Sequence, residues 1–285
     1  MARTGQVPYG SRNAQLLGIC YSRSVETIFA WLSLVLRAQE PAIMSIADNI
    51  VHVCRRIAEA AERAGREPSD VTLVAVSKGF GIETIEQAAA AGLSVFGENR
   101  VQEAAEKISV LPSSLEWHML GHVQSNKAKQ AEALFDRIHS VDSVRLASAL
   151  ARHAADQGRC IPILIQVNVT GKESQFGLPP TDVPAVARSI AACTGIRIDG
   201  LMAIGSFTED EVTLRAEFRA LRQLRDTLES TVPDHPCREL SMGMTNDYPI
   251  AIEEGATIVR VGRAIFGERP LPQSRYEPKK VLQGT

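Results

Sequence analysis

Residues 73–79 read Leu-Val-Ala-Val-Ser-Lys-Gly, an apolar run that stops on a serine, a lysine and a glycine. Such a run, without polar alternation, is typical of a strand buried on both faces of a parallel sheet. Lys78 would then lie at the carboxyl end of the strand, the edge where barrels and open α/β sheets bind ligands. Two roles are open to its amine: a solvated charge, or the nucleophile that condenses with an aldehyde to form a Schiff base.

Similar apolar runs recur along the chain and alternate with helical patterns. A leading amphipathic helix is predicted to begin after Ser45 and to end near Gly65, because its apolar residues recur at helical spacing. Strands are predicted after it at 72–77, 94–97, 117–120, 137–141, 161–169, 196–203, 239–241 and 257–261. Helices are predicted at 82–91, 99–110, from about 125, 143–157, 181–193, 209–230 and 246–254, with a closing one after the final strand.

This alternation predicts the fold class. Strands that alternate with helices form parallel sheets with right-handed crossovers. Eight such units in about 200 residues fit a single α/β domain, a (β/α)8 or TIM barrel with short loops. A doubly wound open sheet is the alternative, but it would require one or two of the weaker strands to be false. No glycine-rich nucleotide-binding motif follows the first strand, which also argues against the open sheet.

The composition is that of a globular protein with no general affinity for nucleic acid or acidic membrane surfaces. Of the 285 residues, 45% are hydrophobic and 22% are charged, and the formal net charge is −2. The cysteines are scattered, at Cys20, Cys54, Cys160, Cys193 and Cys237. No CxxC pair or Cys/His cluster occurs, so neither a disulfide framework nor a zinc site is predicted. The expected compartment is a reducing cytoplasm.

Residues 1–44 differ from the rest of the chain. Arginine outnumbers acidic residues there, and the uncharged apolar stretch at 27–36 is too short to span a bilayer. We expect a poorly ordered extension, with a docked helix at 25–38 or a targeting peptide as the alternatives. The expected organisation is therefore an extension at 1–44, one barrel domain at 45–270 and a tail at 271–285.

Glycines and amides follow several of the predicted strands, where they either shape turns or approach a ligand. Asn99 follows the second strand, His118 and the stretch 121–127 lie at and after the third, and Asn168 lies near the end of the fifth. Turn formation is the simpler role for any one of them. Asn99 is retained as a candidate for ligand binding.

The loops after the last two strands carry a more specific pattern. Residues 241–243 (Ser-Met-Gly) lead from strand seven towards a helix, and residues 260–263 (Arg-Val-Gly-Arg) carry strand eight into the closing helix. In many barrels these two loops bind a phosphate through backbone N–H groups. Gly262 would let the backbone approach an anion, and the arginines would add positive charge. Two ordinary turns with exposed arginines are the alternative.

One ligand accounts for both features. Pyridoxal 5′-phosphate has an aldehyde for Lys78 and a phosphate for the last two loops, and in a closed barrel the first strand neighbours the eighth. A phosphorylated sugar held by a Schiff-base aldolase would have the same layout, and it remains the rival ligand.

Six stretches, taken together and in order, resemble one known family. They are LVAVSK (73–78), FGENRVQE (96–103), EWHMLGHVQSNK (116–127), GLMAI (200–204), LSMGMTND (240–247) and VRVGRAIFG (259–267). From about Ile46 to Gly267 the chain resembles the pyridoxal phosphate homeostasis proteins, called YggS in bacteria and PROSC in animals. The resemblance implies a single barrel similar to the amino-terminal domain of bacterial alanine racemases.

The same resemblance implies roles for individual residues. Lys78 should carry the cofactor as a Schiff base, and Arg260 should face the pyridine nitrogen. The implied phosphate contacts are Ser241 and the backbone around Met242, Gly262 and Arg263.

Two features argue against a catalyst with its own substrate. Because a guanidinium does not give up its proton, Arg260 would leave the pyridine nitrogen unprotonated and weaken the cofactor as an electron sink. The residues after Gly267 are too few to form the second domain that would supply an acid or base on the opposite face of a racemase substrate.

The expectation is therefore a carrier that binds pyridoxal phosphate and helps to maintain vitamin B6 and amino-acid balance. Its expected partners are apo forms of pyridoxal-phosphate-dependent enzymes, with no nucleic acid and no membrane, and its expected state is a monomer or weak dimer. Lys127 is either a surface residue, the simpler reading, or a second lysine that relays the cofactor. The alternative function is an amino-acid racemase completed across a dimer interface.

Overall fold

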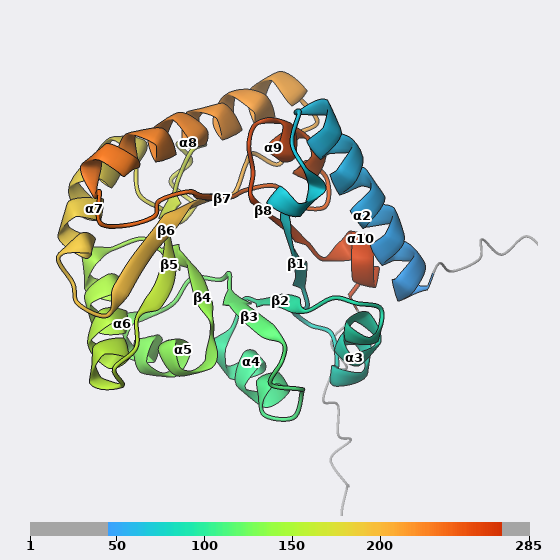
Figure 1. The fold of residues 1–285 in the computed structure, drawn as a ribbon, viewed down its shortest axis with the longest axis horizontal. Coiled ribbons are helices and arrows are strands. Elements are labelled where there is room, and N and C mark those ends of the chain that lie inside the picture. Colours follow the sequence, from blue (N-terminus) through green and yellow to red (C-terminus); the bar gives the residue numbers. More distant parts are fainter. Residues whose placement is uncertain (1–44, 270–285) are drawn as a thin grey trace, which may run out of the picture. The chain divides into compact units, whose positions relative to one another are not determined.

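The computed structural model describes residues 45–269, whose fold is shown in Figure 1. The extension predicted at 1–44, with its alternative helix at 25–38, and the tail predicted at 271–285 lie outside the described residues.

Eight parallel strands close into a barrel in the order in which they occur in the sequence. They are β1 (Thr72–Val76), β2 (Val95–Glu98), β3 (Glu116–Met119), β4 (Arg137–Val141), β5 (Ile161–Val167), β6 (Ile196–Ala203), β7 (Glu239–Ser241) and β8 (Ile258–Val261). β8 pairs with β1, with Ala75 opposite Val261, and this pairing closes the sheet. The predicted (β/α)8 barrel is confirmed, and the open-sheet alternative is wrong.

Helices surround the strands (Figure 1). They are α2 (Ile46–Arg63), α3 (Ile82–Ala90), α4 (Val101–Ile108), α5 (Ala128–Leu134), α6 (Val144–Asp156), α7 (Val183–Ala191), α8 (Glu211–Thr231), α9 (Tyr248–Glu253) and α10 (Arg263–Phe266). Short 3-10 turns precede β1, α5 and α7, namely η1 (Pro68–Asp70), η2 (Ser125–Lys127) and η3 (Pro180–Asp182). The helices predicted from about 125 and from 181 therefore each begin as a tighter turn. No helix in this part of the chain is long and apolar enough to cross a membrane.

The leading helix α2 packs beside α9 and α10, next to the junction of β1 and β8 (Figure 1). It begins at a capping box, in which Ser45 accepts a hydrogen bond from the Asp48 N–H and the Asp48 carboxylate accepts one from the Ser45 N–H. Its apolar stripe, including Ile50 and Val53, is buried. The Asn49 side chain donates to the carbonyl of Ile265 at 2.9 Å, which ties α2 to the turn that follows β8.

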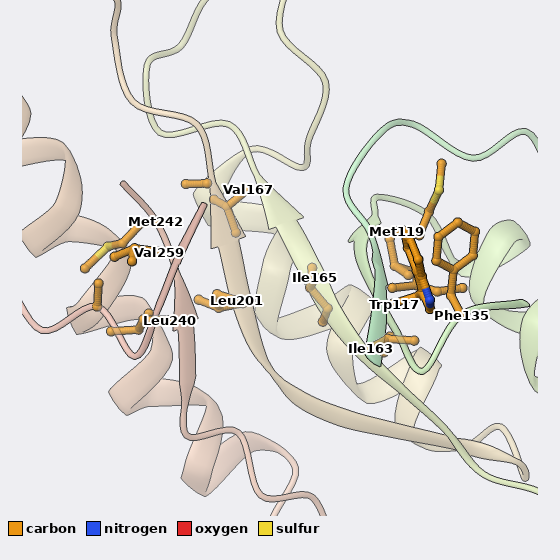
Figure 2. Packing of buried hydrophobic residues seen from close by; sticks show 14 of the residues in the cluster. Trp117, Met119, Phe135, Ile163, Ile165, Val167, Leu201, Leu240, Met242 and Val259 are labelled. Atoms are coloured by element: carbon orange, nitrogen blue, oxygen red, sulfur yellow. The ribbon is translucent and has the colours of Figure 1, made fainter. Parts of the chain in front are cut away.

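Side chains on the strands alternate between two layers because successive residues point to opposite faces of a sheet. The outer layer packs against the helices, including Leu146 of α6 and Phe218 of α8. Figure 2 shows part of this layer, with sticks on Trp117, Met119, Phe135, Ile163, Ile165, Val167, Leu201, Leu240, Met242 and Val259.

The inner layer fills the barrel and is apolar only in part. Its apolar cluster consists of Val74, Leu120, Leu164, Met202 and Ile258. Arg260 shares the inner face of β8 with Ile258, since Val259 and Val261 belong to the outer layer. By the same alternation Ser241 of β7 and His118 of β3 point inward. Polar side chains therefore occupy the interior of the barrel beneath its carboxyl-terminal edge.

Candidate functional site

A cavity of about 1410 Å³ lies at the carboxyl-terminal edge of the barrel, where sites in this fold are found. Five of the seven candidate residues line it: Lys78, Asn99, Arg260, Gly262 and Arg263. The loop between β6 and α8 contributes residues 206–209, and α2 contributes His52 and Arg56. The structure therefore brings the lysine that follows β1 and the turn that follows β8 into one cavity.

The ends of β1 and β8 are in close contact at this point. Ala75 pairs with Val261, so Lys78 and Gly262 leave neighbouring strands at the same edge. A Cβ atom placed on Gly262 would lie 3.1 Å from the carbonyl oxygen of Val76 and 3.3 Å from its Cβ. Glycine therefore permits the close approach of the two strands, and it leaves the backbone of this turn uncovered by a side chain.

The side chain of Lys78 is half-buried within the cavity. Burial lowers the pKa of its amine below the ordinary 10.5, and the positive charge of Arg269 lowers it further, while Glu98 opposes the shift. A larger fraction of the amine is therefore unprotonated at neutral pH than in a free lysine. The unprotonated form is the nucleophile required for addition to a carbonyl carbon.

A buried ionic cluster holds the backbone on both sides of Lys78. The ammonium of Lys107 donates to the carbonyl of Ser77 at 3.0 Å, to Glu98 Oε1 at 2.6 Å and to Glu103 Oε1 at 2.7 Å. The Glu103 carboxylate also accepts the N–H of Gly79 at 2.6 Å. Lys107 of α4 thus holds the peptide unit before Lys78 directly, and the peptide unit after it through Glu103.

Glu98 is the deepest member of this ionic cluster. Its side chain has no exposed surface, and it accepts the Ser77 hydroxyl at 2.8 Å in addition to Lys107. Burial raises its pKa, although Lys107 and Ser77 act in the opposite direction. Its second oxygen, Oε2, has no hydrogen-bond partner among the described residues. The ionised form of Glu98 therefore depends on Lys107.

Ser241 and Met242, the other two candidates, lie behind the cavity and are not among its lining residues in the described part of the chain. Both are fully buried. The Ser241 hydroxyl accepts a hydrogen bond from Arg260 Nη1 at 2.6 Å and lies 2.9 Å from His139 Nδ1. The Met242 side chain belongs to the outer layer (Figure 2). The phosphate contact predicted for these two residues remains a prediction.

Arg260 joins the barrel interior to the cavity. Its second terminal nitrogen, Nη2, donates to the carbonyl of Ala203 at 2.8 Å. Burial lowers its pKa to about 10, and the charge of Asp247 acts in the opposite direction. The guanidinium therefore remains a cation at neutral pH.

The loop between β7 and α9 contributes residues that were not singled out from the sequence as site candidates. Thr245 and Asn246 line the cavity, and Arg263 Nη2 donates to Asn246 Oδ1 at 3.3 Å. Asp247 accepts the N–H of Met244 at 2.5 Å and precedes α9 as its N-cap residue. One signal in the sequence could have identified these residues: they follow β7 and therefore lie at the same edge of the sheet as Gly262.

The remaining residues that the sequence singled out lie elsewhere. Lys127 is half-buried in η2 and is not a lining residue of the cavity in the described structure. Asn168 shapes its own loop, with its amide donating to the carbonyl of Lys172 at 2.8 Å. His118 faces the barrel interior. Within residues 45–269, no three His, Cys, Asp or Glu side chains are grouped as metal ligands.

Gly121 fixes the backbone of Asn99, and replacing it with alanine should destabilise the site. A Cβ at Gly121 would lie 2.2 Å from the carbonyl oxygen of Asn99, so one of the two backbones must move. We expect a loss of about 1–3 kcal/mol in the free energy of unfolding, the usual cost of overpacking. Chemical denaturation measures it. Gly81→Ala is the control, because its Cβ would meet only Glu83 at 3.7 Å; equal losses in the two variants would contradict the prediction.

Comparison with known proteins agrees with this geometry. A family model for the alanine racemase N-terminal domain matches residues 48–270. A pyridoxal phosphate homeostasis protein of Pseudomonas aeruginosa is 41% identical over 226 residues, covering 79% of this chain and 96% of the relative. The structure of PipY from Synechococcus elongatus with PLP bound is also 41% identical, with a TM-score of 0.66, and covers 74% of this chain and 100% of that one.

A more distant structure supports the fold alone. Alanine racemase from Corynebacterium glutamicum is 17% identical, with a TM-score of 0.59, and covers 80% of this chain and 63% of that one. The family model and the P. aeruginosa relative together span nearly the whole described barrel. The chain belongs to the family of pyridoxal phosphate homeostasis proteins, which is built on the alanine racemase N-terminal barrel.

Proposed function

We propose that this protein binds pyridoxal 5′-phosphate as a Schiff base on Lys78 and delivers it to other proteins, without a catalytic substrate of its own. The observation that carries the proposal is the shared cavity of the Lys78 amine and the turn after β8. An aldehyde and a phosphate on one small ring match these two features. The PLP-bound structure of PipY and the names of the relatives give independent support.

The covalent step needs only the lysine and the aldehyde. The unprotonated Lys78 amine would add to the aldehyde carbon, a carbon–nitrogen double bond would replace the carbonyl, and the carbonyl oxygen would leave as water with the two hydrogens of the amine. The lowered pKa of Lys78 favours this addition at neutral pH. The ionic cluster of Lys107 keeps the backbone of Lys78 in place, so the amine is presented from one fixed position.

The phosphate is assigned to the turns after β7 and β8. Gly262 leaves its backbone without a side chain, Arg263 supplies a positive charge, and Thr245 in the loop after β7 supplies a hydroxyl. The backbone around Met242 completes the proposed set from behind, whereas the Ser241 hydroxyl is engaged by Arg260 and His139. Asn99 lines the cavity beside β2 and is proposed as a contact to the ring.

Arg260 is proposed to face the pyridine nitrogen, and this supports a carrier over an enzyme. A cation with a pKa of about 10 does not protonate the ring, so the electron-sink chemistry that the cofactor supplies to enzymes stays weak. We propose that the protein acts in a reducing cytoplasm, since its cysteines are scattered in the sequence without a CxxC pair. The proposed role is vitamin B6 and amino-acid homeostasis.

Transfer to an acceptor tests the delivery step. Protein loaded with pyridoxal phosphate is mixed with an excess of an apo-enzyme that depends on this cofactor, and recovery of that enzyme's activity is followed. We expect recovery without added free cofactor, at a rate above that of spontaneous release into buffer. Retention of the cofactor on the loaded protein under these conditions would contradict delivery.

The match to the alanine racemase family model supports one alternative function, that of an amino-acid racemase completed across a dimer interface. Such an enzyme would exchange the α-hydrogen of alanine or serine for deuterium in D2O. We expect no exchange above that given by free pyridoxal phosphate. Exchange at rates typical of an enzyme would favour the racemase.

The pH dependence of Schiff-base formation should report the lowered pKa of Lys78. The rate of formation, followed by absorbance, should rise with pH and level off with a midpoint below 10.5. Since Arg269 lowers this pKa, Arg269→Met should move the midpoint upwards. The exposed residue Arg152 of α6 provides the control, because Arg152→Met should leave the midpoint unchanged. A midpoint at or above 10.5 in the wild type would contradict the prediction.

A further inference from the structure

A row of buried polar side chains crosses the barrel interior from β8 to β3. Arg260 Nη1 lies 2.6 Å from Ser241 Oγ, Ser241 Oγ lies 2.9 Å from His139 Nδ1, and His139 Nε2 lies 3.0 Å from His118 Nδ1. His118 Nε2 then lies 2.7 Å from Glu116 Oε1. The four inner members are at most 5% exposed, whereas the Glu116 side chain is 46% exposed. The row therefore connects the cavity to the opposite face of the barrel.

With both imidazoles neutral, the two ends of this row allow only one direction of donation. A guanidinium can only donate, so Ser241 accepts from Arg260, and its own hydrogen is free to turn towards His139. The hydrogen bond from His118 lowers the pKa of Glu116, so its carboxylate is ionised at neutral pH and can only accept. A neutral imidazole at each position must then carry its proton on Nε2 and accept through Nδ1. The tautomers of His139 and His118 are assigned by the groups at the two ends of the row.

A second proton on His139 has no place in this arrangement. It would sit on Nδ1, point at Ser241 Oγ and displace the hydroxyl hydrogen, beside the guanidinium of Arg260. Burial lowers the pKa of His139 well below its ordinary value, and the positive charges of Arg260 and Arg137 act in the same direction. His139 is therefore neutral at pH 7.

We propose that His139 and His118 are positioning residues, which orient the Arg260 guanidinium in the cavity through the hydroxyl of Ser241. His139 takes the hydroxyl hydrogen, which leaves an oxygen lone pair aimed at Arg260 Nη1. The carbonyl of Ala203 holds the other terminal nitrogen at 2.8 Å. The guanidinium is thus fixed from two sides before any ligand enters. The effect on bound cofactor rests on the proposed function, because there Arg260 faces the pyridine ring.

The tautomers are tested first on protein without cofactor. Long-range proton–nitrogen NMR on histidine-labelled protein at pH 7 distinguishes Nε2–H, Nδ1–H and doubly protonated rings, with resonances assigned through His139→Asn and His118→Gln. We expect both rings to be neutral with the proton on Nε2. An Nδ1–H tautomer or an imidazolium at either position overturns the inference. This result does not depend on whether the protein binds pyridoxal phosphate, so it separates the two proposals.

The link to the cofactor is tested with a matched pair of substitutions. In His139→Asn the amide oxygen takes the place of Nδ1 and still accepts from Ser241, whereas His139→Leu removes the acceptor. We expect His139→Leu to bind pyridoxal phosphate about tenfold more weakly, at the upper end of the cost of one lost hydrogen bond, and to shift the absorbance maximum of the bound form. His139→Asn should stay close to the wild type in both measurements.

Equal spectra and equal affinities in His139→Leu and the wild type would overturn the inference, and so would equal impairment of the leucine and asparagine variants. Thermal unfolding of each variant is measured alongside, because a structural role alone would change stability without changing the absorbance maximum. If His139→Leu does not fold, the tautomers in the unmutated protein decide the question.

Discussion

Lys78→Ala should abolish the absorbance band that develops when pyridoxal phosphate is added to the protein, and with it the covalent label that borohydride leaves. The band arises from the carbon–nitrogen double bond, which requires the amine of residue 78. The fold should be unaffected, because burial and Arg269 already disfavour the lysine charge in the folded state. The variant should therefore unfold at a temperature no lower than that of the wild type.

Lys127→Ala is the matched control for this experiment, since Lys127 lies in η2 and is not a lining residue of the cavity in the described structure. We expect it to keep the full band, and peptide mapping after borohydride reduction should find the label at Lys78 alone. A band that survives in Lys78→Ala would contradict the proposed site. Loss of the band in Lys127→Ala would favour a relay through the second lysine.

Lys107→Met should cause the largest loss of stability of any substitution considered. The Lys107 side chain is only 7% exposed and pairs with Glu98, whose side chain has no exposed surface. Removing one partner of a buried pair leaves an uncompensated charge, at a cost of about 3–5 kcal/mol. Denaturant unfolding measures the loss. Because Lys107 also holds the carbonyl of Ser77, the variant should bind pyridoxal phosphate more weakly.

The deficit of Lys107→Met should grow with pH. Without Lys107 the pKa of Glu98 in the folded state rises further above its unfolded value, so the native state binds the extra proton. Stability is then fully retained below the unfolded pKa and is lost as pH rises through the folded pKa. We therefore expect a larger deficit at pH 8 than at pH 5, and Glu98→Gln in the Lys107→Met background should remove this dependence.

Arg55→Met supplies a control for the loss of an ion pair as such. Arg55 and Glu59 form an exposed pair, with side chains 65% and 54% exposed. Its loss should change the free energy of unfolding by less than about 1 kcal/mol. Similar losses for Arg55→Met and Lys107→Met would show that the burial of the Lys107 cluster does not matter.

The sequence was sufficient for the fold because each strand is a short apolar run between helices of amphipathic pattern. The boundaries of individual strands and helices were predicted less accurately. The strand predicted at 161–169 ends at Val167, and two of the predicted helices begin with a 3-10 turn. The position of Lys78 and the turn at Gly262 in one cavity was also predictable, since parallel strands in a barrel end at one edge.

The supporting residues could not be predicted in the same way. Lys107 lies on a helix that reads as solvent-facing at that position, and only the burial of Glu98 on β2 shows why it points inward. His139 lies in a strand with no distinguishing motif, and its contact with Ser241 spans 102 residues of sequence. Thr245 and Asn246 carry a helix-capping pattern that masks their place in the cavity wall.

The junction of β1 and β8 has a consequence for the newly made chain. On the ribosome, Lys78 leaves the exit tunnel long before Gly262, so a growing chain exposes the Lys78 amine without the burial that lowers its pKa and without the turn that faces it. If Lys78 and the turn at Gly262 hold the cofactor as proposed, its capture requires translation through the last strand. A stalled or truncated chain that ends before β8 would therefore bind free pyridoxal phosphate only weakly. Stable binding of the cofactor would then indicate that the chain is fully synthesised and that β8 has closed the barrel against β1.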